Sequence, residues 1–268
     1  MNTSFKKLVK ELNTGIDERK KLEEYKDIIA KKVLQNANDA LQDCKAALKL
    51  AEDINNPDYI AYYTHQSGNC FHAISEYDNA EENILHAIEL YSEKNETKNL
   101  VACHLNLANV YIHKKEFRKG LKHLSESYRL NQIDNSPLIK ARLLNNFGVV
   151  YMDTDNFKKA LKYFLDCIKI SKEIDSWFDL QSCYVNIGMI YKKQKDYKNS
   201  LKYLSSALEL NGRLKDKYRE GYILYNYADV YFEQGEYDKA LSFSENSLKL
   251  FEELGDKSMV SANYVFKG

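Results

Sequence analysis

Apolar positions recur with a helical spacing along most of the chain, and the stretch from Tyr225 to Phe251 shows the pattern most completely. In its first half, Tyr227, Ala228 and Tyr231 share one helical face. Residues 234–236, which read Gln-Gly-Glu, then interrupt the pattern. The apolar spacing resumes at Tyr237, Ala240, Leu241, Leu248 and Leu250. The stretch therefore predicts two antiparallel helices joined by a tight turn.

The same pattern occurs in four earlier copies, each displaced by 40 residues. Every copy has a small residue, an aromatic residue three positions later and a second aromatic residue six positions after that. The small residues are Gly68, Ala108, Gly148, Gly188 and Ala228. The aromatic residues are Phe71, Tyr111, Tyr151, Tyr191 and Tyr231, followed by Tyr77, Phe117, Phe157, Tyr197 and Tyr237. We expect the small residues to let the helices of a pair approach closely, and the aromatic residues to fill the space between successive pairs.

Each repeat thus contains a first helix and a second helix. The pattern predicts first helices at 58–74, 98–114, 138–153, 178–194 and 217–234, and second helices at 78–94, 118–131, 157–173, 198–213 and 238–254. Two of the first helices have a start signal, because Pro57 follows Asn56 and Pro137 follows Ser136. An Asn or Ser cap followed by proline in the first turn is typical of a helix N-terminus.

The motif resembles the tetratricopeptide repeat (TPR), in which a small residue and an aromatic precede the turn, and an aromatic and a small residue follow it. In the last copy these are Ala228, Tyr231, Tyr237 and Ala240. The period of 40 is longer than the usual 34, which suggests extended helices or loops, and it is similar to that of kinesin light chain, Pins-like scaffolds and bacterial peptide-pheromone receptors. The resemblance implies an all-α solenoid, a right-handed superhelix of antiparallel helix pairs.

The two ends of the chain depart from the repeat. We expect residues 1–57 to form an N-terminal helical cap, a degenerate repeat in which Ile28 and Lys31 replace the usual Gly and Tyr, preceded by a short helix over 4–12. Residues 58–256 form five TPR units. Residues 257–268 read as part of another first helix, so we expect the sequence to be a truncated piece of a longer protein.

The charge balance argues against some partners. Lys plus Arg and Asp plus Glu number 39 each, so no overall charge attracts nucleic acid or an anionic membrane. Apolar runs are far shorter than the roughly 20 residues of a membrane helix, and the N-terminus lacks the apolar core of a secretory signal. The five scattered cysteines form no C-x-x-C pair and read as buried thiols. We therefore expect a cytoplasmic protein that binds neither nucleic acid nor membrane.

A row of amides is the main candidate for function. Counting the small residue of each first helix as position 8, position 6 holds Gln66, Asn106, Asn146, Asn186 and Asn226. Asparagine costs up to about 0.7 kcal/mol relative to alanine inside a helix, and carboxamides can pair with both halves of a ligand's peptide bonds. In the peptide-binding TPR proteins that this sequence resembles, Asn at this site clasps the ligand backbone in the concave groove. The alternative is a consensus asparagine that is merely solvated.

Neighbouring positions on the same face are mixed in chemistry. Position 9 supplies Asn69, Asn109, Val149, Met189 and Asp229, and position 2 supplies Arg142 and Tyr222 among others. We expect backbone contacts to set the affinity for a peptide, and side chains such as Val149 and Met189 to select among peptides. The Lys/Asn/Arg set that reads a terminal carboxylate in chaperone-binding TPR domains is not reproduced, and Arg142 is the one groove arginine that we expect to contribute.

Catalytic and metal-binding patterns are missing from the sequence. It contains no G-x-S-x-G, P-loop, H-E-x-x-H or dinucleotide-binding glycine motif. His65 and His72 lie seven residues apart, but no further ligand completes a metal site. We therefore expect no catalytic residue, no metal and no cofactor. Trp177 and Phe178 form an aromatic pair before the fourth first helix, which either is exposed or staples that helix.

The sequence predicts a non-catalytic scaffold or sensor that binds a peptide or an extended protein segment and belongs to a larger signalling protein. Two alternatives remain open. The chain could instead be a structural scaffold that forms homo-oligomers through its edge at 257–268. It could also be the regulatory domain of an enzyme whose catalytic part lies beyond residue 268.

Overall fold

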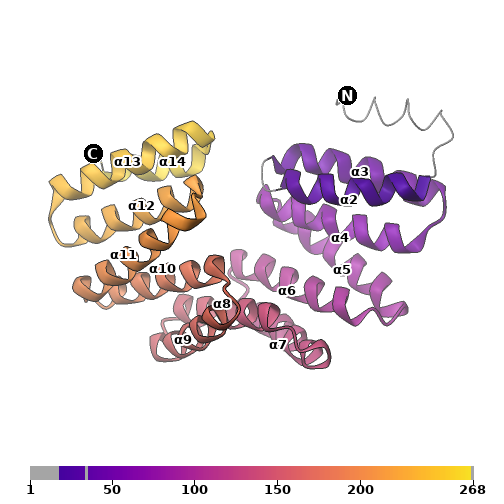
Figure 1. The fold of residues 1–268 in the computed structure, drawn as a ribbon, viewed down its shortest axis with the longest axis horizontal. Coiled ribbons are helices and arrows are strands. Elements are labelled where there is room, and N and C mark those ends of the chain that lie inside the picture. Colours follow the sequence, from indigo (N-terminus) through magenta and orange to yellow (C-terminus); the bar gives the residue numbers. More distant parts are fainter. Residues whose placement is uncertain (1–17, 34–35, 267–268) are drawn as a thin grey trace. The chain divides into compact units, whose positions relative to one another are not determined.

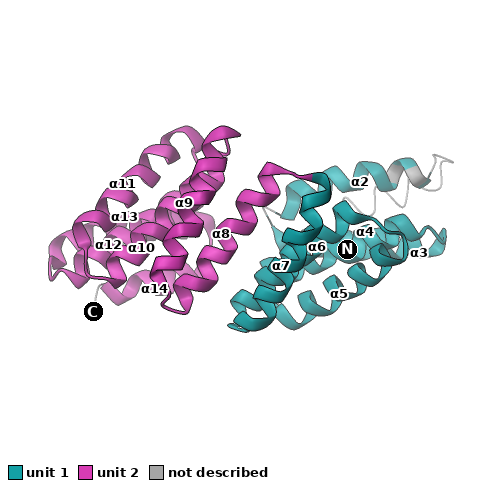
Figure 2. Cartoon of the chain, turned by 90° about the horizontal axis from the view of Figure 1, so that it is seen from below, with its two compact units in different colours: residues 1–134 teal, residues 135–268 magenta. Residues whose placement is uncertain are grey.

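The computed structural model describes residues 18–33 and 36–266, and within them the protein is built of helices (Figure 1). The short helix expected over residues 4–12 lies outside the described residues. None of the helices in the described ranges combines the length and the hydrophobicity that crossing a bilayer requires. The chain divides into two compact units, residues 1–134 and residues 135–268, coloured separately in Figure 2. We call them unit 1 and unit 2 and describe each by itself.

From residue 18 onward, unit 1 contains two helices that precede the regular repeats, followed by two helix pairs. The helices are α2 (Glu18–Val33), α3 (Ala37–Asp53), α4 (Pro57–Ala73), α5 (Tyr77–Glu93), α6 (Thr97–His113) and α7 (Phe117–Asp134). Each first helix packs on its own second helix, α4 on α5 and α6 on α7. Helix α3 packs against α4 and buries Ala40, Leu41 and Ala47, the positions at which the degenerate sequence still matches a second helix.

Unit 2 contains three helix pairs and a shorter terminal segment. Its elements are α8 (Pro137–Asp153), α9 (Phe157–Glu173), α10 (Trp177–Lys193), α11 (Tyr197–Leu214), α12 (Lys217–Glu233), α13 (Tyr237–Leu254), α14 (Lys257–Asn263) and the 3-10 helix η1 (Tyr264–Phe266). The pairs are α8 with α9, α10 with α11, and α12 with α13. The regular helices begin within one residue of their predicted starts, and the fold is the all-α solenoid of helix pairs that the pattern predicted.

The helix starts follow from the local sequence. Asn56 accepts hydrogen bonds from the backbone N–H groups of Asp58 and Tyr59, and Ser136 accepts one from Ile139. Proline occupies the first turn of both helices, where a backbone N–H would have no partner in the helix. The proline signals in the sequence therefore mark the true starts of α4 and α8.

A left-handed residue every 20 positions explains the long period. The residues with positive φ are Asn55, Ser75, Asn95, Lys115, Asn135, Asp155, Asp175, Lys195, Lys215, Gly235 and Gly255. Each follows a helix of 17 or 18 residues and begins the turn into the next one. A helix and its turn therefore take 20 residues, and two such units give the repeat of 40. The extra length lies in the helices and not in long loops.

These turns give a stability prediction, because Lys195 and Gly235 occupy the same turn in successive repeats with φ of 61° and 77°. A side chain in the left-handed region costs roughly 1–2 kcal/mol, a cost that glycine avoids. We expect Lys195→Gly to raise the free energy of unfolding by about 1 kcal/mol, and Gly235→Ala to lower it by a similar amount. Chemical denaturation of both variants measures this, and a loss of stability in Lys195→Gly would contradict it.

The first aromatic of the repeat packs differently from the prediction, whereas the second packs as predicted at Tyr77, whose ring stacks on His113 of the next repeat at 5.5 Å. Tyr151 stacks on Tyr163 with ring centroids 5.5 Å apart, and Tyr191 stacks on Tyr203 at 5.6 Å. Both contacts join the first helix to the second helix of the same repeat. The first aromatic therefore closes its own helix pair, whereas the sequence suggested that it fills the space between successive pairs. Sequence spacing did not show this, because the facing position on the second helix varies among Asn, His, Tyr and Phe.

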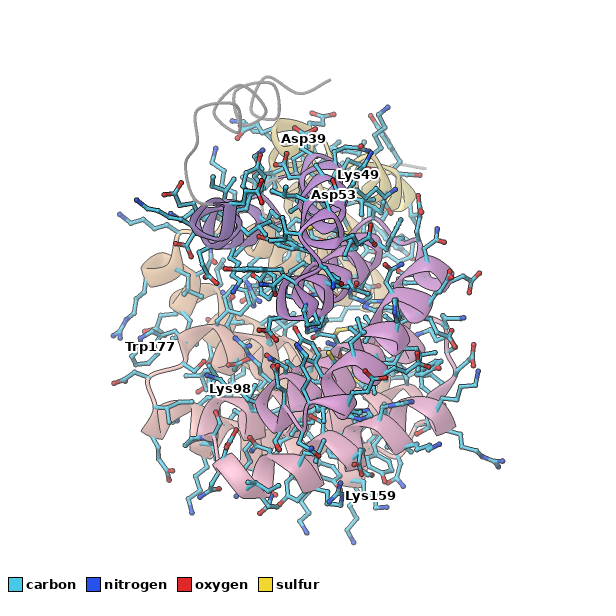
Figure 3. The ribbon with its side chains drawn as sticks, turned by 90° about the vertical axis from the view of Figure 1, so that its right-hand side faces the viewer. Asp39, Lys49, Asp53, Lys98, Lys159 and Trp177 are labelled. Atoms are coloured by element: carbon cyan, nitrogen blue, oxygen red, sulfur yellow. The ribbon has the colours of Figure 1, made fainter. Side chains whose placement is uncertain are left out.

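The small residues pack as predicted, and the closest approach is at Gly148. A Cβ at this position would lie 2.5 to 2.8 Å from three carbons of the Phe164 ring on the facing helix α9. Phe164 is fully buried, so the ring has little space into which it can move. Charged side chains occupy the outer surfaces of the helices, as Lys49, Lys98 and Lys159 illustrate (Figure 3).

Candidate functional site

In unit 1, the predicted amides of two successive first helices meet. Asn69 on α4 donates a hydrogen bond to Gln66 Oε1 at 3.3 Å, and Asn106 on α6 donates one to Asn69 Oδ1 at 2.8 Å. The Asn106 nitrogen also lies 3.1 Å from His65 Nε2. Gln66, Asn69 and Asn106 are each partly exposed, whereas His65 is buried. The three amides therefore form one chain of hydrogen bonds across two repeats, with a histidine beneath it.

In unit 2, the amide contact involves a residue that the sequence analysis did not select. Asn186 on α10 donates to Asn145 Oδ1 on α8 at 3.2 Å, and Cys183 Sγ lies 3.7 Å from the same oxygen. Asn145 and His65 occupy the same repeat position, next to the row of amides. The sequence does contain a sign of this contact, because Asn145 and His65 are polar at a position where other repeats have Leu105 or Val185.

Asn226 and Asn146, both members of the predicted amide row, differ in how far their side chains are exposed to solvent. Asn226 is only 5% exposed and donates to the backbone carbonyl of Tyr222, so its nitrogen is used within α12. Asn146 is partly exposed, and it makes a further interaction within the protein, as does Asn109 of unit 1. The five amides at position 6 are thus not equally exposed, because Asn226 is buried and the other four are partly exposed.

Three of the selected side chains form a half-buried apolar strip in unit 2. The Tyr222 hydroxyl on α12 lies 3.9 Å from the Met189 sulfur on α10, and Val149 on α8 packs in the same hydrophobic cluster as Met189. Burial raises the pKa of the Tyr222 hydroxyl, with a smaller contribution from the nearby carboxylates of Asp153 and Asp229. The strip can therefore offer an apolar surface with one neutral hydroxyl.

The charged members of the set are paired within the protein. Arg142 Nε lies 3.9 Å from the Asp179 carboxylate, and Asp229 forms an ion pair with Lys192. The Arg142 side chain is half exposed, whereas that of Asp179 is mostly buried. Ser176 also donates to Asp179 at 2.6 Å. Each of these ion pairs links two neighbouring first helices of unit 2.

The family model of the tetratricopeptide repeat matches residues 100–173 and 179–253, which together cover more than half of the chain. The chain belongs to the tetratricopeptide repeat family. No curated protein resembles the TPR chain closely enough to count as a relative. The fold of the chain can, however, be compared with solved structures.

Solved structures of low sequence identity share the TPR fold. The quorum sensor NprR from B. thuringiensis, in its apo form, is 16% identical with a TM-score of 0.72, covering 98% of this chain and 73% of NprR. NprR in complex with its cognate peptide NprX is 16% identical with a TM-score of 0.76, covering 98% and 75%. A Rap protein complexed with Competence and Sporulation Factor is 15% identical with a TM-score of 0.66, covering 92% and 70%.

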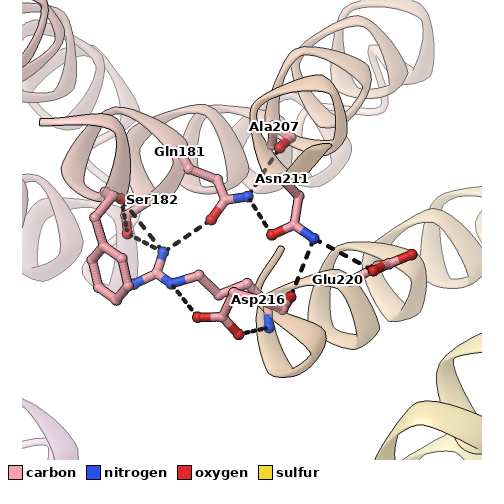
Figure 4. Close-up of polar contacts among 8 residues, drawn as sticks. Gln181, Ser182, Ala207, Asn211, Asp216 and Glu220 are labelled. Carbon is pink, nitrogen blue, oxygen red and sulfur yellow. Dashed lines mark hydrogen bonds and ion pairs between the residues drawn. The ribbon is translucent and has the colours of Figure 1, made fainter. Parts of the chain in front are cut away.

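A polar network that the TPR pattern does not contain joins three helices of unit 2 (Figure 4). Gln181, which is 1% exposed, donates to the Ala207 carbonyl at 3.0 Å and to Asn211 Oδ1 at 3.2 Å. Arg219 Nη1 donates to Gln181 Oε1 at 3.2 Å and to Ser182 Oγ at 3.0 Å. Other repeats have Ala, Val or Gly in place of Gln181. The network therefore fixes the turn between α11 and α12 against α10, in this repeat specifically.

Trp177 and Phe178, which the sequence placed before the fourth first helix, are the first two residues of α10, and an arginine lies over each ring. The Arg213 guanidinium lies 5.1 Å from the Trp177 ring centroid, and that of Arg219 lies 3.1 Å from the Phe178 ring centroid. Phe178 nevertheless remains 50% exposed. The pair therefore connects its helix to the next repeat of the TPR array, and Phe178 adds an accessible aromatic edge.

The histidines of the TPR chain lie between His65 and His123, all of them in unit 1. Burial lowers the pKa of His65, His72 and His123 to about 4 in each case. His104 Nδ1 and His123 Nδ1 are 2.9 Å apart. Within residues 18–33 and 36–266, His, Cys, Asp and Glu side chains form no group of three or more that could hold a metal ion. His65 is thus a neutral, hydrogen-bonded group of the core, whereas Nε2 of His72 is buried without a hydrogen-bond partner among the described residues.

The five cysteines are free and buried, as the sequence predicted. Cys44 and Cys70 have their sulfur atoms 3.8 Å apart between α3 and α4. Burial raises the pKa of the Cys103 thiol far above its usual range. The Cys103 thiol is therefore unreactive, because the thiolate is the nucleophilic form.

Proposed function

We propose that this protein is a non-catalytic peptide-binding sensor or scaffold, and that the first helices of its repeats carry the ligand. The single observation that supports the proposal most strongly is the chain of amides in unit 1, from Gln66 through Asn69 to Asn106. Carboxamides held in fixed positions can bind the polar groups of an extended backbone without a strong preference for side chains. The similarity to NprR, whose structure contains a cognate peptide, supports a peptide as the ligand.

The ligand would be an extended peptide, or an extended segment of a partner protein, that crosses several first helices. The remaining selected residues would act on its side chains. Val149, Met189 and Tyr222 would contact an apolar side chain, while Arg142 and Asp229 would contact polar ones. In a larger signalling protein, a ligand that contacts several repeats would favour one arrangement of those repeats and so change the state of an attached partner.

The test of this proposal is the double variant Asn146→Ala and Asn186→Ala. Each lost hydrogen bond to a ligand costs about 1.4 kcal/mol, which is tenfold in affinity, so we expect the pair to weaken binding by about 100-fold. The melting temperature should change little. Binding is measured by fluorescence anisotropy with a labelled peptide selected from a random synthetic library.

A matched control is the double variant Asn83→Ala and Asn246→Ala. These amides lie on second helices and donate to backbone carbonyls four residues earlier. We expect peptide affinity to stay unchanged in the control. If the first-helix variant loses stability and binding together, or if both double variants lose binding equally, the solvated-asparagine interpretation is favoured instead.

The alternative function, assembly through the edge at 257–268, is supported by exposed apolar side chains. Tyr264 is 51% exposed and Val265 is 66% exposed. A second copy of this chain could cover them. Analytical ultracentrifugation of the protein and of Val265→Asp distinguishes the two functions, because a dimer that Val265→Asp dissociates supports assembly, and a concentration-independent monomer argues against it.

A further inference from the structure

The amide nitrogen of Asn106 has both of its hydrogens directed into the protein. A carboxamide nitrogen carries two N–H donors. One is directed to Asn69 Oδ1 at 2.8 Å, and the other to His65 Nε2 at 3.1 Å. Asn106 is partly exposed, so its remaining polar atom, Oδ1, is the one available to a ligand. An oxygen of this kind accepts hydrogen bonds and cannot donate them.

His65 determines this orientation, because a neutral imidazole has one nitrogen that donates and one that accepts. His65 is 5% exposed, and its burial lowers its pKa to about 4, so it is neutral at pH 7. With Nε2 accepting from Asn106, the proton of the ring is on Nδ1. No charged group is needed to hold this state, since burial alone causes the shift.

The side-chain amide of Asn186 in unit 2 is oriented in the same way, with its nitrogen donating within the protein. Its nitrogen donates to Asn145 Oδ1 at 3.2 Å. Asn145 Oδ1 also accepts a hydrogen bond from the Cys183 thiol, whose sulfur lies 3.7 Å away, and this is consistent with an oxygen at that position. The Asn226 nitrogen is likewise used within the protein, by the Tyr222 carbonyl at 2.7 Å. At Asn106, Asn186 and Asn226, therefore, the amide nitrogen donates within the protein, whereas Gln66 accepts through its oxygen from Asn69.

We propose that the amides of unit 1 recognise an N–H group of the ligand through Asn106 Oδ1, and that His65 is the positioning residue for Asn106. Within unit 2, Asn186 Oδ1 would accept in the same way. This inference rests on the proposed function and makes it more specific. The ligand class is an extended peptide with free backbone N–H groups at the residues that face these oxygens. Successive residues of an extended chain direct their N–H groups to opposite sides, so only alternate residues are read.

The tautomer of His65 tests the orientation without any ligand. A long-range proton–nitrogen correlation spectrum at pH 7 distinguishes a protonated ring nitrogen from a bare one. We expect Nδ1 to carry the proton and Nε2 to be bare. The opposite tautomer would overturn the inference, because Nε2–H would then donate to Asn106 and turn its nitrogen toward the ligand.

Amide-to-ester substitution tests the recognition of N–H groups. The probe is the tightest-binding octapeptide from the random synthetic library, together with analogues in which one backbone N–H at a time is replaced by oxygen. We expect one or more esters to bind about tenfold more weakly than the parent peptide. The effect of the ester that faces Asn106 should disappear in Asn106→Ala. Ester losses that persist in Asn106→Ala and in Asn186→Ala, or esters that bind as well as the parent, would overturn the inference.

Variants of His65 test its positioning role. His65→Leu removes the acceptor, so we expect weaker peptide binding and a smaller effect of the ester that faces Asn106. His65→Gln supplies an acceptor oxygen and should restore both, and thermal denaturation verifies that each variant is folded. If Asn146→Ala with Asn186→Ala weakens binding by about 100-fold while the ester and His65 results fail, only this inference is wrong. If that double variant leaves binding intact, the proposed function itself is wrong.

Discussion

Gly148→Ala is expected to destabilise the protein by about 2 kcal/mol, although alanine is the better helix former. The new Cβ would lie 2.5 Å from Phe164 Cε1 and 2.7 Å from Cδ1, closer than van der Waals contact permits. Because the ring is fully buried, either it or the backbone of α8 must move. Overpacking of this kind costs about 1–3 kcal/mol. Urea denaturation followed by circular dichroism measures the change.

Two further variants make this prediction specific. A Cβ added at Gly212 on α11 would meet no atom within 4 Å, so Gly212→Ala should stabilise the protein by about 0.5–1 kcal/mol. Adding Phe164→Leu to Gly148→Ala recreates the pair found at Ala108 and Leu124, and should recover part of the lost stability. Equal effects of alanine at Gly148 and Gly212, or strictly additive effects of Gly148→Ala and Phe164→Leu, would contradict close packing at this site.

Acid is expected to unfold unit 1 before unit 2. The pKa of His65 is lowered to about 4 in the folded protein, against about 6.5 in an unfolded chain. The unfolded state therefore binds more protons between these values, and the free energy of unfolding falls as the pH drops from 6.5 toward 4. For the buried His65 the loss is on the order of 3 kcal/mol. His72 and His123, whose pKa values are also lowered, add to it.

Hydrogen exchange measured at pH 7, 5.5 and 4.5, corrected for the intrinsic exchange rate, tests this prediction. We expect α4 to α7 to lose protection first, while α8 to α13 remain protected, because unit 2 has no histidine. His65→Gln should reduce the pH dependence of unit 1. Loss of protection in unit 2 at the same or a higher pH would contradict the account.

The spacing of apolar residues was sufficient to predict the helix pairs, because small and aromatic residues recur at fixed positions that packing requires. It could not explain the period of 40. The turns use left-handed Asn, Asp, Ser and Lys residues, such as Asn95 and Lys195, at positions where glycine would be expected. It also did not show that Tyr151 stacks within its own repeat, since the partner Tyr163 is not part of the repeat pattern.

The candidate site was less predictable than the fold. Helical spacing placed Asn106 and Asn69 on one face, and their contact across two repeats agrees with that placement. It could not distinguish Asn226, which is buried, from the partly exposed Asn186, because burial depends on the neighbouring helix. The sequence shows His65 only as a histidine without a metal partner, and its contact with Asn106 depends on side-chain orientation that spacing does not determine. The residues that hold the amides are thus found only from the structure.

The central claim is that the first helices carry an extended peptide, and the side-chain amide signals of the protein test it most directly. The measurement is a proton–nitrogen correlation spectrum recorded while the library-selected peptide is added. We predict that the side-chain signals of Asn69, Asn106 and Asn186 shift or broaden, while those of Asn83 and Asn246 on second helices stay in place. Changes confined to the second helices, or to residues 257–266, would contradict the claim.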